Sequence, residues 1–249
     1  MRHFESIFLY PLNKSHNEYQ ARIFTVDEEL DFAGHPLIGA TCAIHDEYHK
    51  NSARVITKFK LNTRELDICS QKKSTYYSAT MNQGTPEFLS QIPQRSLGNI
   101  GEAFNLTKEN LADLPLEVVS TGLSYLIVPL KSGLDKVQHS NIAPLLSKYN
   151  AKFVYFYDIL KQEGRTWDNN GNVEDIATGS AVGPLGAYLV KHNLAKLNET
   201  ITIHQGRFLR RPSELTVMAS GTKDAITQIA VSGDTCIIGS GIINPTEII

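Results

Sequence analysis

Short strand-like runs dominate the hydrophobic pattern of this chain. They are rich in β-branched and aromatic residues and are bounded by polar residues, Gly or Pro. In chain order they are SIFLYPL, ARIFTV, ARVITKF, LSYLIVPL, KFVYFYDIL, ITIHQG, ELTVMAS and TCIIGSGII. Helical periodicity is rarer and predicts helices over residues 35–49, 105–113, 139–149 and 179–193. The pattern therefore predicts an α+β protein with many strands and few helices.

A linker near the middle of the chain predicts two halves. The segment FNLTKENLADLP is typical of a helix start with Thr107 as N-cap, and Pro115 ends that helix before a new strand begins. We therefore expect one half at 1–115 and another at 116–239, with residues 240–249 packing on the first. Each half is predicted to be a barrel-like sheet around one central helix.

Composition and charge narrow the class of protein. The 249 residues are 41% hydrophobic and 20% charged, and the formal net charge of −2 offers no overall basic surface to nucleic acid or an anionic membrane. No apolar run approaches the ~18–20 residues of a membrane span. The three cysteines are scattered, which predicts free thiols in the cytoplasm. The eight histidines show no paired ligand spacing, so we expect no metal.

Two segments, one in each half, resemble each other. ELDFAGHPLIGATCAIHDEY and NVEDIATGSAVGPLGAYLVKHN each contain an acidic residue, a turn of small residues and an apolar helical run. A helix N-terminus has unpaired N–H groups and a positive partial charge, so it can bind a carboxylate. Two such ends facing across a cleft would hold a small acidic substrate. The alternative is two well-capped core helices, with Thr178 or Ser180 capping the second.

The polar residues on the two turns favour a functional site. His35 and Asp175 flank the two helix starts. A lone His is more often a surface or satisfied core residue, and an Asp before a helix is more often a cap. The occurrence of both at equivalent ends of a repeat is harder to explain by packing alone, and it favours a site between the halves.

Four linked motifs resemble the phenazine-biosynthesis PhzF-like isomerases, which are related in fold to diaminopimelate epimerase. RIFTVDEELDFAGHPLIGA resembles the segment that leads into the family's Gly-His-Pro turn, and VEDIATGSAVGPLGAYLVKHN resembles its Glu-Asp-Pro-Ala-Thr-Gly-Ser-Ala stretch. HQGRFLRRPSEL is similar to its Gln-Gly and Arg-Pro-Ser segment, and STGLSYLIVPL to the strand that opens its second half. The order and spacing of all four make the resemblance specific.

The resemblance implies a site and a class of reaction. HFESIFLYP is similar to the family's Ser-Glu-Thr/Ser-x-Phe motif, which implies that Glu5 moves a proton on the substrate carbon skeleton, assisted by His35 and Asp175. The expected substrate-binding residues are Gly34, Thr178, Gly179 and Ser180. The implied function is that of a cofactor-independent isomerase, a cytoplasmic homodimer, acting on a small acidic metabolite.

The sequence departs from the family pattern in three places, and two of these, Phe4 and the missing lead-in, favour a different class of protein, which the retained Glu5, His35 and Asp175 oppose. Phe4 stands where the family has Ser beside the carboxylate, and Ile176 stands where it has Pro. Family members also begin with a strand–strand–helix lead-in, whereas Glu5 lies almost at the start of this chain, so either the sequence is truncated at its start or the first half lacks strands. The alternative is a catalytically silent small-molecule-binding or structural protein on a truncated copy of the fold.

The residues themselves permit the implied chemistry. A proton shift on one face of a substrate needs one group that removes a proton and returns it to a neighbouring carbon, and a carboxylate serves if partial burial raises its pKa. Glu5 is followed by apolar residues that would desolvate it. A two-cysteine racemase of the same fold needs a thiol at each helix start, but His35 and Ser180 stand there, and Cys42 lies two turns further along.

Overall fold

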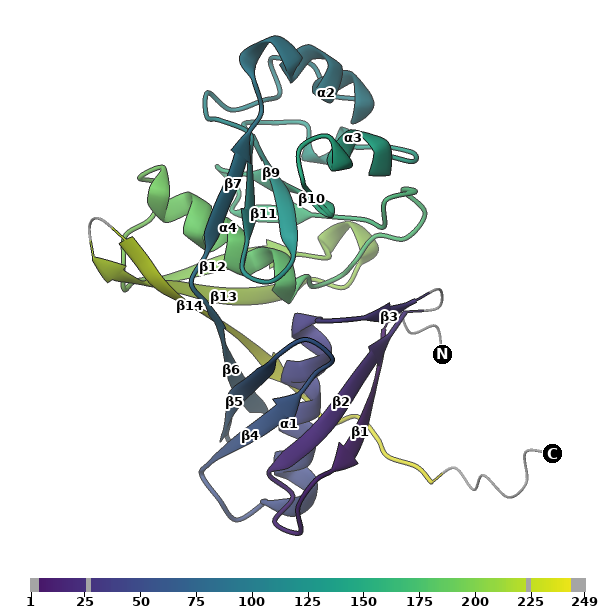
Figure 1. The fold of residues 1–249 in the computed structure, drawn as a ribbon, viewed down its shortest axis with the longest axis vertical. Coiled ribbons are helices and arrows are strands. Elements are labelled where there is room, and N and C mark those ends of the chain that lie inside the picture. Colours follow the sequence, from purple (N-terminus) through teal and green to yellow (C-terminus); the bar gives the residue numbers. More distant parts are fainter. Residues whose placement is uncertain (1–4, 26–27, 223–224, 243–249) are drawn as a thin grey trace, which may run out of the picture.

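The computed structural model describes residues 5–25, 28–222 and 225–242. The chain forms two halves, which lie at the bottom and the top of Figure 1. Helix α1 (Gly34–Tyr48) is the centre of the first half, and helix α4 (Gly179–Lys191) is the centre of the second. This arrangement confirms the predicted α+β fold of two sheet-rich halves, each built on one helix.

The N-terminal half packs its strands against α1. These strands are β1 (Ser6–Pro11), β2 (Glu18–Phe24), β3 (Glu29–Leu30), β4 (Arg54–Lys60), β5 (Glu65–Lys72) and β6 (Tyr77–Gly84). Burial alternates along β4 and β6, as it does in strands with one face on a core. Phe59 and Met81 on these strands belong to the same apolar cluster as Leu37 of α1. Burial of this cluster holds the helix against the sheet.

The C-terminal half encloses its helix more completely. Its elements are β7 (Glu87–Gln91), η1 (Gln94–Ser96), α2 (Leu97–Ala103), β8 (Glu117–Ser120), β9 (Ser124–Leu130), η2 (Leu134–Lys136), α3 (Ala143–Ser147), β10 (Phe153–Asp158), β11 (Glu163–Arg165), α4, β12 (Thr200–Gln205), η3 (Arg207–Leu209), β13 (Ser213–Thr222) and β14 (Ala225–Thr235). Every residue of α4 from Gly179 to Leu189 is buried, so this stretch has no solvent face. No helix in the described ranges is long and apolar enough to cross a lipid bilayer.

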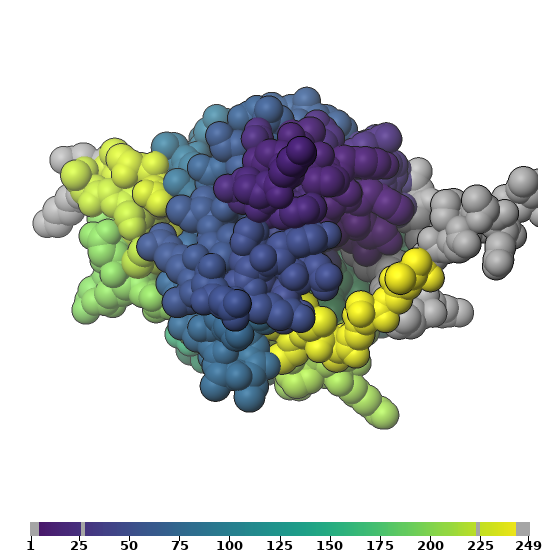
Figure 2. Space-filling view, turned by 90° about the horizontal axis from the view of Figure 1, so that it is seen from below, coloured from purple at the N-terminus to yellow at the C-terminus, as the bar shows by residue number. Residues whose placement is uncertain are grey.

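One sheet runs through both halves. Its strand order is β1-β2-β4-β5-β6-β14-β13-β12-β11-β10-β9-β8-β7, and β3 pairs with β2. Strand β14 joins the halves, because it pairs with β13 through residues 225–232 and with β6 through residues 229–235. Seen from below, the yellow C-terminal chain accordingly emerges beside the blue strands of the first half (Figure 2).

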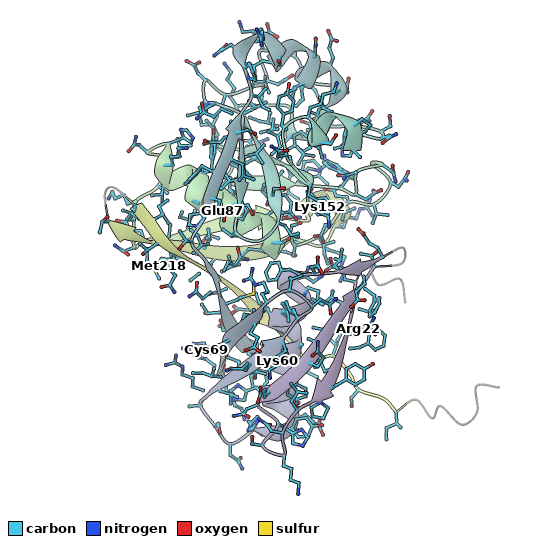
Figure 3. The ribbon with its side chains drawn as sticks, viewed as in Figure 1. Arg22, Lys60, Cys69, Glu87, Lys152 and Met218 are labelled. Atoms are coloured by element: carbon cyan, nitrogen blue, oxygen red, sulfur yellow. The ribbon has the colours of Figure 1, made fainter. Side chains whose placement is uncertain are left out.

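The packing of side chains places the boundary between the two halves before residues 115 and 116. Side chains between Ile92 and Leu111 belong to the apolar cluster that covers β8, β9 and β10 of the second half. In Figure 3, Lys60 marks the lower half and Glu87 already lies in the upper half. The packing of the described residues therefore favours a boundary between the halves in the turn between β6 and β7.

Two helix predictions are wrong in extent or place. The segment 105–113 forms turns, because the Asn110 side chain accepts hydrogen bonds from the N–H and the hydroxyl of Thr107. The nearest helix, α2, precedes this segment. The helix predicted over 139–149 is limited to the five residues of α3.

The C-terminal strand prediction is also wrong within the described residues. TCIIGSGII begins at Thr235, where β14 ends, and residues 236–242 have no regular secondary structure. Residues 240–242 are exposed. The remaining residues of the expected contact with the first half, 243–249, lie outside the described residues.

Candidate active site

The starts of α1 and α4 meet where the two halves join. The backbone at Gly34 lies so close to α4 that an added Cβ atom would be 2.9 Å from the Gly179 carbonyl carbon and 3.0 Å from the Ser180 nitrogen. Only glycine permits this approach, because any larger residue would meet backbone atoms that cannot move independently. The structure therefore brings the small residues of the two predicted turns together.

Glu5 immediately precedes β1 and lies beside His35. Its side chain is 8% exposed, and its Oε2 atom is 3.2 Å from His35 Nε2. The two groups are close but not aligned as a hydrogen bond, so Oε2 has no hydrogen-bond partner in the described residues. Burial and, secondly, the charge of Asp175 raise the pKa of Glu5 from 4.5 to about 8. At neutral pH most of this carboxyl group therefore holds its proton.

His35 is the second residue of α1 and contacts the second half. Burial lowers the pKa of its imidazole, whereas the charge of Asp175 and a hydrogen bond with the Ala177 backbone oppose this effect. The side chain still exposes 38% of its surface, so a bound molecule can reach the ring. An imidazole beside a protonated carboxyl group can exchange a proton with it or stabilise negative charge on a neighbouring molecule.

Hydrogen bonds fix the turn that leads into α4. The Thr178 hydroxyl donates to Asp175 Oδ2 at 2.7 Å, and the Ala177 N–H donates to Asp175 Oδ1 at 3.3 Å. Thr178 is the N-cap residue of α4, but its side chain makes no capping hydrogen bond. The capping role considered for the two hydroxyls is therefore wrong. Ser180 instead shares a hydrogen bond of 2.8 Å with the Tyr125 hydroxyl.

Four buried residues complete the surroundings of the site, although the motifs did not single them out. They are Gln83, Tyr125, Tyr155 and Gln205. Tyr125 and Gln205 stand inside the motifs STGLSYLIVPL and HQGRFLRRPSEL, so a sequence signal was present. Gln83 on β6 donates to the Gly179 carbonyl at 2.9 Å across 96 residues of chain, and no local pattern identifies that contact.

The residues of the site do not favour thiol chemistry. Cys42 is buried on α1, and burial raises the pKa of its thiol to about 11, so the nucleophilic thiolate is scarce at neutral pH. Across the described ranges, no group of three or more His, Cys, Asp or Glu could hold a metal ion. Ile176 lies in the turn between Asp175 and Thr178, and Phe4 lies outside the described residues.

Solved structures of the same architecture define the class of protein. A predicted epimerase from Pseudomonas aeruginosa is 39% identical with a TM-score of 0.86, covering 96% of this chain and 86% of that one. A hydroxyproline epimerase from Agrobacterium vitis shares the fold with a TM-score of 0.65 at 13% identity, covering 94% of this chain and 72% of that one. The second structure shows the shared fold. The first, together with curated relatives that are named isomerases, makes the protein an isomerase.

The sequence relatives give the family. The phenazine biosynthesis-like protein family matches residues 1–241. The trans-2,3-dihydro-3-hydroxyanthranilate isomerase of Pseudomonas chlororaphis is 31% identical over 229 residues, covering 89% of this chain and 78% of that enzyme. An uncharacterised isomerase of Escherichia coli K12 is 28% identical, covering 95% of this chain and 82% of its own length. The chain belongs to the phenazine biosynthesis-like protein family, which confirms the resemblance seen in the motifs.

Proposed function

We propose that this isomerase shifts a proton between two carbon atoms of a small carboxylated metabolite, with Glu5 as the proton carrier and without a cofactor. The observation that supports this most is the buried Glu5 carboxyl group, 3.2 Å from His35 and with a pKa raised to about 8. A group with such a pKa is present in both protonation states near neutral pH, so it can serve as base and then as acid.

The reaction proceeds in two proton transfers. Ionised Glu5 takes a proton from a substrate carbon, and the electron pair left behind moves into a neighbouring double bond. Glu5 then gives a proton, either the one it took or one exchanged with water, to the carbon at the far end of that system, so that substrate and product differ only in the positions of one hydrogen and the double bonds. His35 stabilises the negative charge that develops between the two steps.

Binding of the substrate carboxylate is assigned to the helix starts. The free N–H groups at the beginning of α1 and α4 carry positive partial charge and converge where Gly34 meets Gly179. Ser180 adds a hydroxyl group at the second helix start, whereas the Thr178 hydroxyl donates to Asp175. In this arrangement Glu5 is free to transfer protons, because other groups hold the substrate.

Solvent exchange tests the proposal. In D2O, the wild type should introduce deuterium at a carbon of trans-2,3-dihydro-3-hydroxyanthranilate, the compound in the name of the Pseudomonas chlororaphis relative. Glu5→Gln keeps the shape but cannot titrate, so the exchange rate measured by NMR should fall by ~10²–10⁴-fold. Glu65→Gln, at a side chain that is 57% exposed, is the matched control and should exchange at the wild-type rate.

Two outcomes would contradict the proposal. Exchange by Glu5→Gln at the wild-type rate would assign the proton transfer to another group. A wild type that exchanges no carbon-bound proton of any small carboxylated compound tried would favour the catalytically silent binding protein.

We also propose that the protein is a homodimer. Strand β1 lies at one end of the described sheet, and Phe8, Tyr10 and Leu12 are 52%, 53% and 46% exposed. An edge strand with exposed apolar side chains is stabilised when another chain covers it. Light scattering should give twice the chain mass of 27.7 kDa, and a single-chain mass at all concentrations would contradict the proposal.

A further inference from the structure

The last residue of β12, Gln205, binds the turn that carries Asp175. Its side chain is almost fully buried, and its amide makes four hydrogen bonds. The Nε2 group donates to the Asp175 carbonyl at 2.8 Å and to Thr178 Oγ1 at 2.9 Å. The Oε1 atom accepts from the Tyr155 hydroxyl at 2.9 Å and from the Thr178 N–H at 3.2 Å. Every donor and acceptor of this amide is therefore used.

The partners allow only one orientation of the amide. If the amide were rotated by half a turn, its N–H groups would face the Thr178 N–H, and its oxygen would face the Asp175 carbonyl oxygen. Both contacts would bring together groups of the same polarity, at a buried position where neither can turn to water. Gln205 therefore presents its donors to Thr178 Oγ1 and to the Asp175 carbonyl in the folded protein.

This orientation sets the direction of the Thr178 hydroxyl. Because Gln205 Nε2 donates to Thr178 Oγ1, the hydroxyl oxygen is an acceptor on that side, and its hydrogen is left to point at Asp175 Oδ2, 2.7 Å away. A chain of hydrogen bonds thus leads from Tyr155 through the amide and the hydroxyl to the Asp175 carboxylate. That carboxylate acts electrostatically on both Glu5 and His35.

The glycine after Gln205 permits this close contact. Gly206 has a φ of 82°, and a Cβ atom added there would lie 2.3 Å from the Arg211 carbonyl oxygen and 2.8 Å from the Ile176 carbonyl oxygen. Any other residue would push the end of β12 away from the turn between Asp175 and α4. The Gln-Gly pair in HQGRF therefore acts together: Gly206 allows β12 to approach the turn before α4, and Gln205 makes the hydrogen bonds to that turn.

We infer that Gln205 is a positioning residue for the isomerisation: through the Thr178 hydroxyl, it fixes the orientation of the Asp175 carboxylate relative to Glu5 and His35. The inference rests on the proposed function for its kinetic consequence only. Its structural part, control of the Asp175 carboxylate, is independent of which substrate the enzyme uses.

Four variants separate positioning from simple structural support. Gln205→Glu keeps the shape but replaces the two amide donors with an acceptor. Thr178→Val removes the hydroxyl between Gln205 and Asp175 and leaves residue 205 a glutamine. Thr178→Ser keeps the hydroxyl and should rescue the effect. Gln83→Glu is the matched control, because Gln83 is also buried and also binds the start of α4, through the Gly179 carbonyl, but makes no bond to Thr178 or Asp175.

Two readouts are combined on the full chain. Carboxyl ¹³C NMR at pH 7 should show that Gln205→Glu and Thr178→Val change the chemical shift of the Asp175 carboxyl carbon, because the hydrogen bond from the Thr178 hydroxyl is lost or misdirected. Deuterium exchange should show kcat lower by about 10- to 100-fold, with little change in KM. Thr178→Ser should match the wild type in both readouts, and Gln83→Glu should leave the chemical shift of the Asp175 carboxyl carbon unchanged.

The inference is overturned if the Asp175 carboxyl carbon of Thr178→Val has the chemical shift that it has in the wild type, a result that stands even if Gln205→Glu fails to fold. It is equally overturned if Gln83→Glu changes the NMR signal of the Asp175 carboxyl carbon as much as Gln205→Glu does. Any change in the packing of the α4 start would then produce the effect. If the wild type exchanges no substrate proton, the proposed function fails, and the carboxyl ¹³C NMR spectra still decide whether Gln205 controls Asp175.

Discussion

The two helix starts that meet between the halves are chemically unequal. At α1, the buried Oε2 of Glu5 has no hydrogen-bond partner in the described residues, and His35 is 38% exposed. At α4, Asp175, Thr178 and Ser180 all have hydrogen-bonded side chains. The first start therefore carries groups whose protonation is easily changed, and the second carries groups whose positions are fixed.

This difference explains how a repeated fold can support one reaction. Proton transfer needs a group that is poorly solvated and lightly bonded, because hydrogen bonds to the charged form of a carboxylate would lower its pKa. Orientation of a substrate needs the opposite, a set of groups held rigidly by satisfied bonds. The repeat supplies two similar helix starts, and the side chains around them separate the two tasks.

The largest effect that we expect is on stability, and it comes from Glu5 beside the start of α1. Because the pKa of Glu5 is about 8 in the folded protein and about 4.5 in an unfolded chain, the folded state keeps a proton that the unfolded state has lost between these pH values. Stability should therefore fall as pH rises through this window. In Glu5→Gln this loss of stability is absent, so at pH 8 the free energy of unfolding of the variant should exceed that of the wild type by a few kcal/mol.

Urea unfolding from pH 4.5 to 8.5 measures this difference. The other titrating groups contribute almost equally to both proteins, so they cancel in the comparison. Glu65→Gln should follow the wild-type curve at every pH. If the free energy of unfolding had the same pH dependence in Glu5→Gln and in the wild type, the folded protein would not retain the Glu5 proton.

An intermediate effect is expected where the two helix starts touch. In Gly34→Ala the new methyl group would meet the Gly179 carbonyl carbon at 2.9 Å, so the halves must separate slightly, at a cost of about 1–3 kcal/mol. Gly39→Ala, on the same helix, meets no atom within 4 Å and should be neutral or stabilising by up to about 1 kcal/mol. Equal unfolding free energies for the two variants would contradict the close approach of α1 and α4.

The smallest effect that we expect comes from a hydrogen bond that holds Ser180 at the start of α4. Tyr125→Phe removes the buried hydrogen bond of 2.8 Å to Ser180 Oγ, which should cost about 0.5–1.5 kcal/mol and lower Tm by a few degrees. Calorimetry measures the shift. Tyr10→Phe, at a residue that is 53% exposed, should leave Tm unchanged. A Tyr125→Phe protein as stable as the wild type would mean that the Ser180 hydroxyl is not held by this bond.

Some local signals were overridden by tertiary contacts. Thr107 in FNLTKENLADLP is a good helix N-cap by its residue type, yet its hydroxyl and N–H bind the Asn110 side chain. The following residues join the sheet, because the Ala112 N–H donates to the Pro129 carbonyl at 2.9 Å. The weak helical preference of a short segment is easily outweighed by such contacts.

The sequence by itself determined the two central helices and the small-residue turns that open them, because both depend on local patterns of apolar, small and polar residues. It also carried the motif residues that converge at the site, through their order in the family pattern. Only the tertiary structure decided that Glu5 lies against His35, that Gly34 touches Gly179 and that Gln205 binds Thr178. These contacts join residues brought together by the pairing of strands and the packing of two halves, and a local pattern contains no information about such distances.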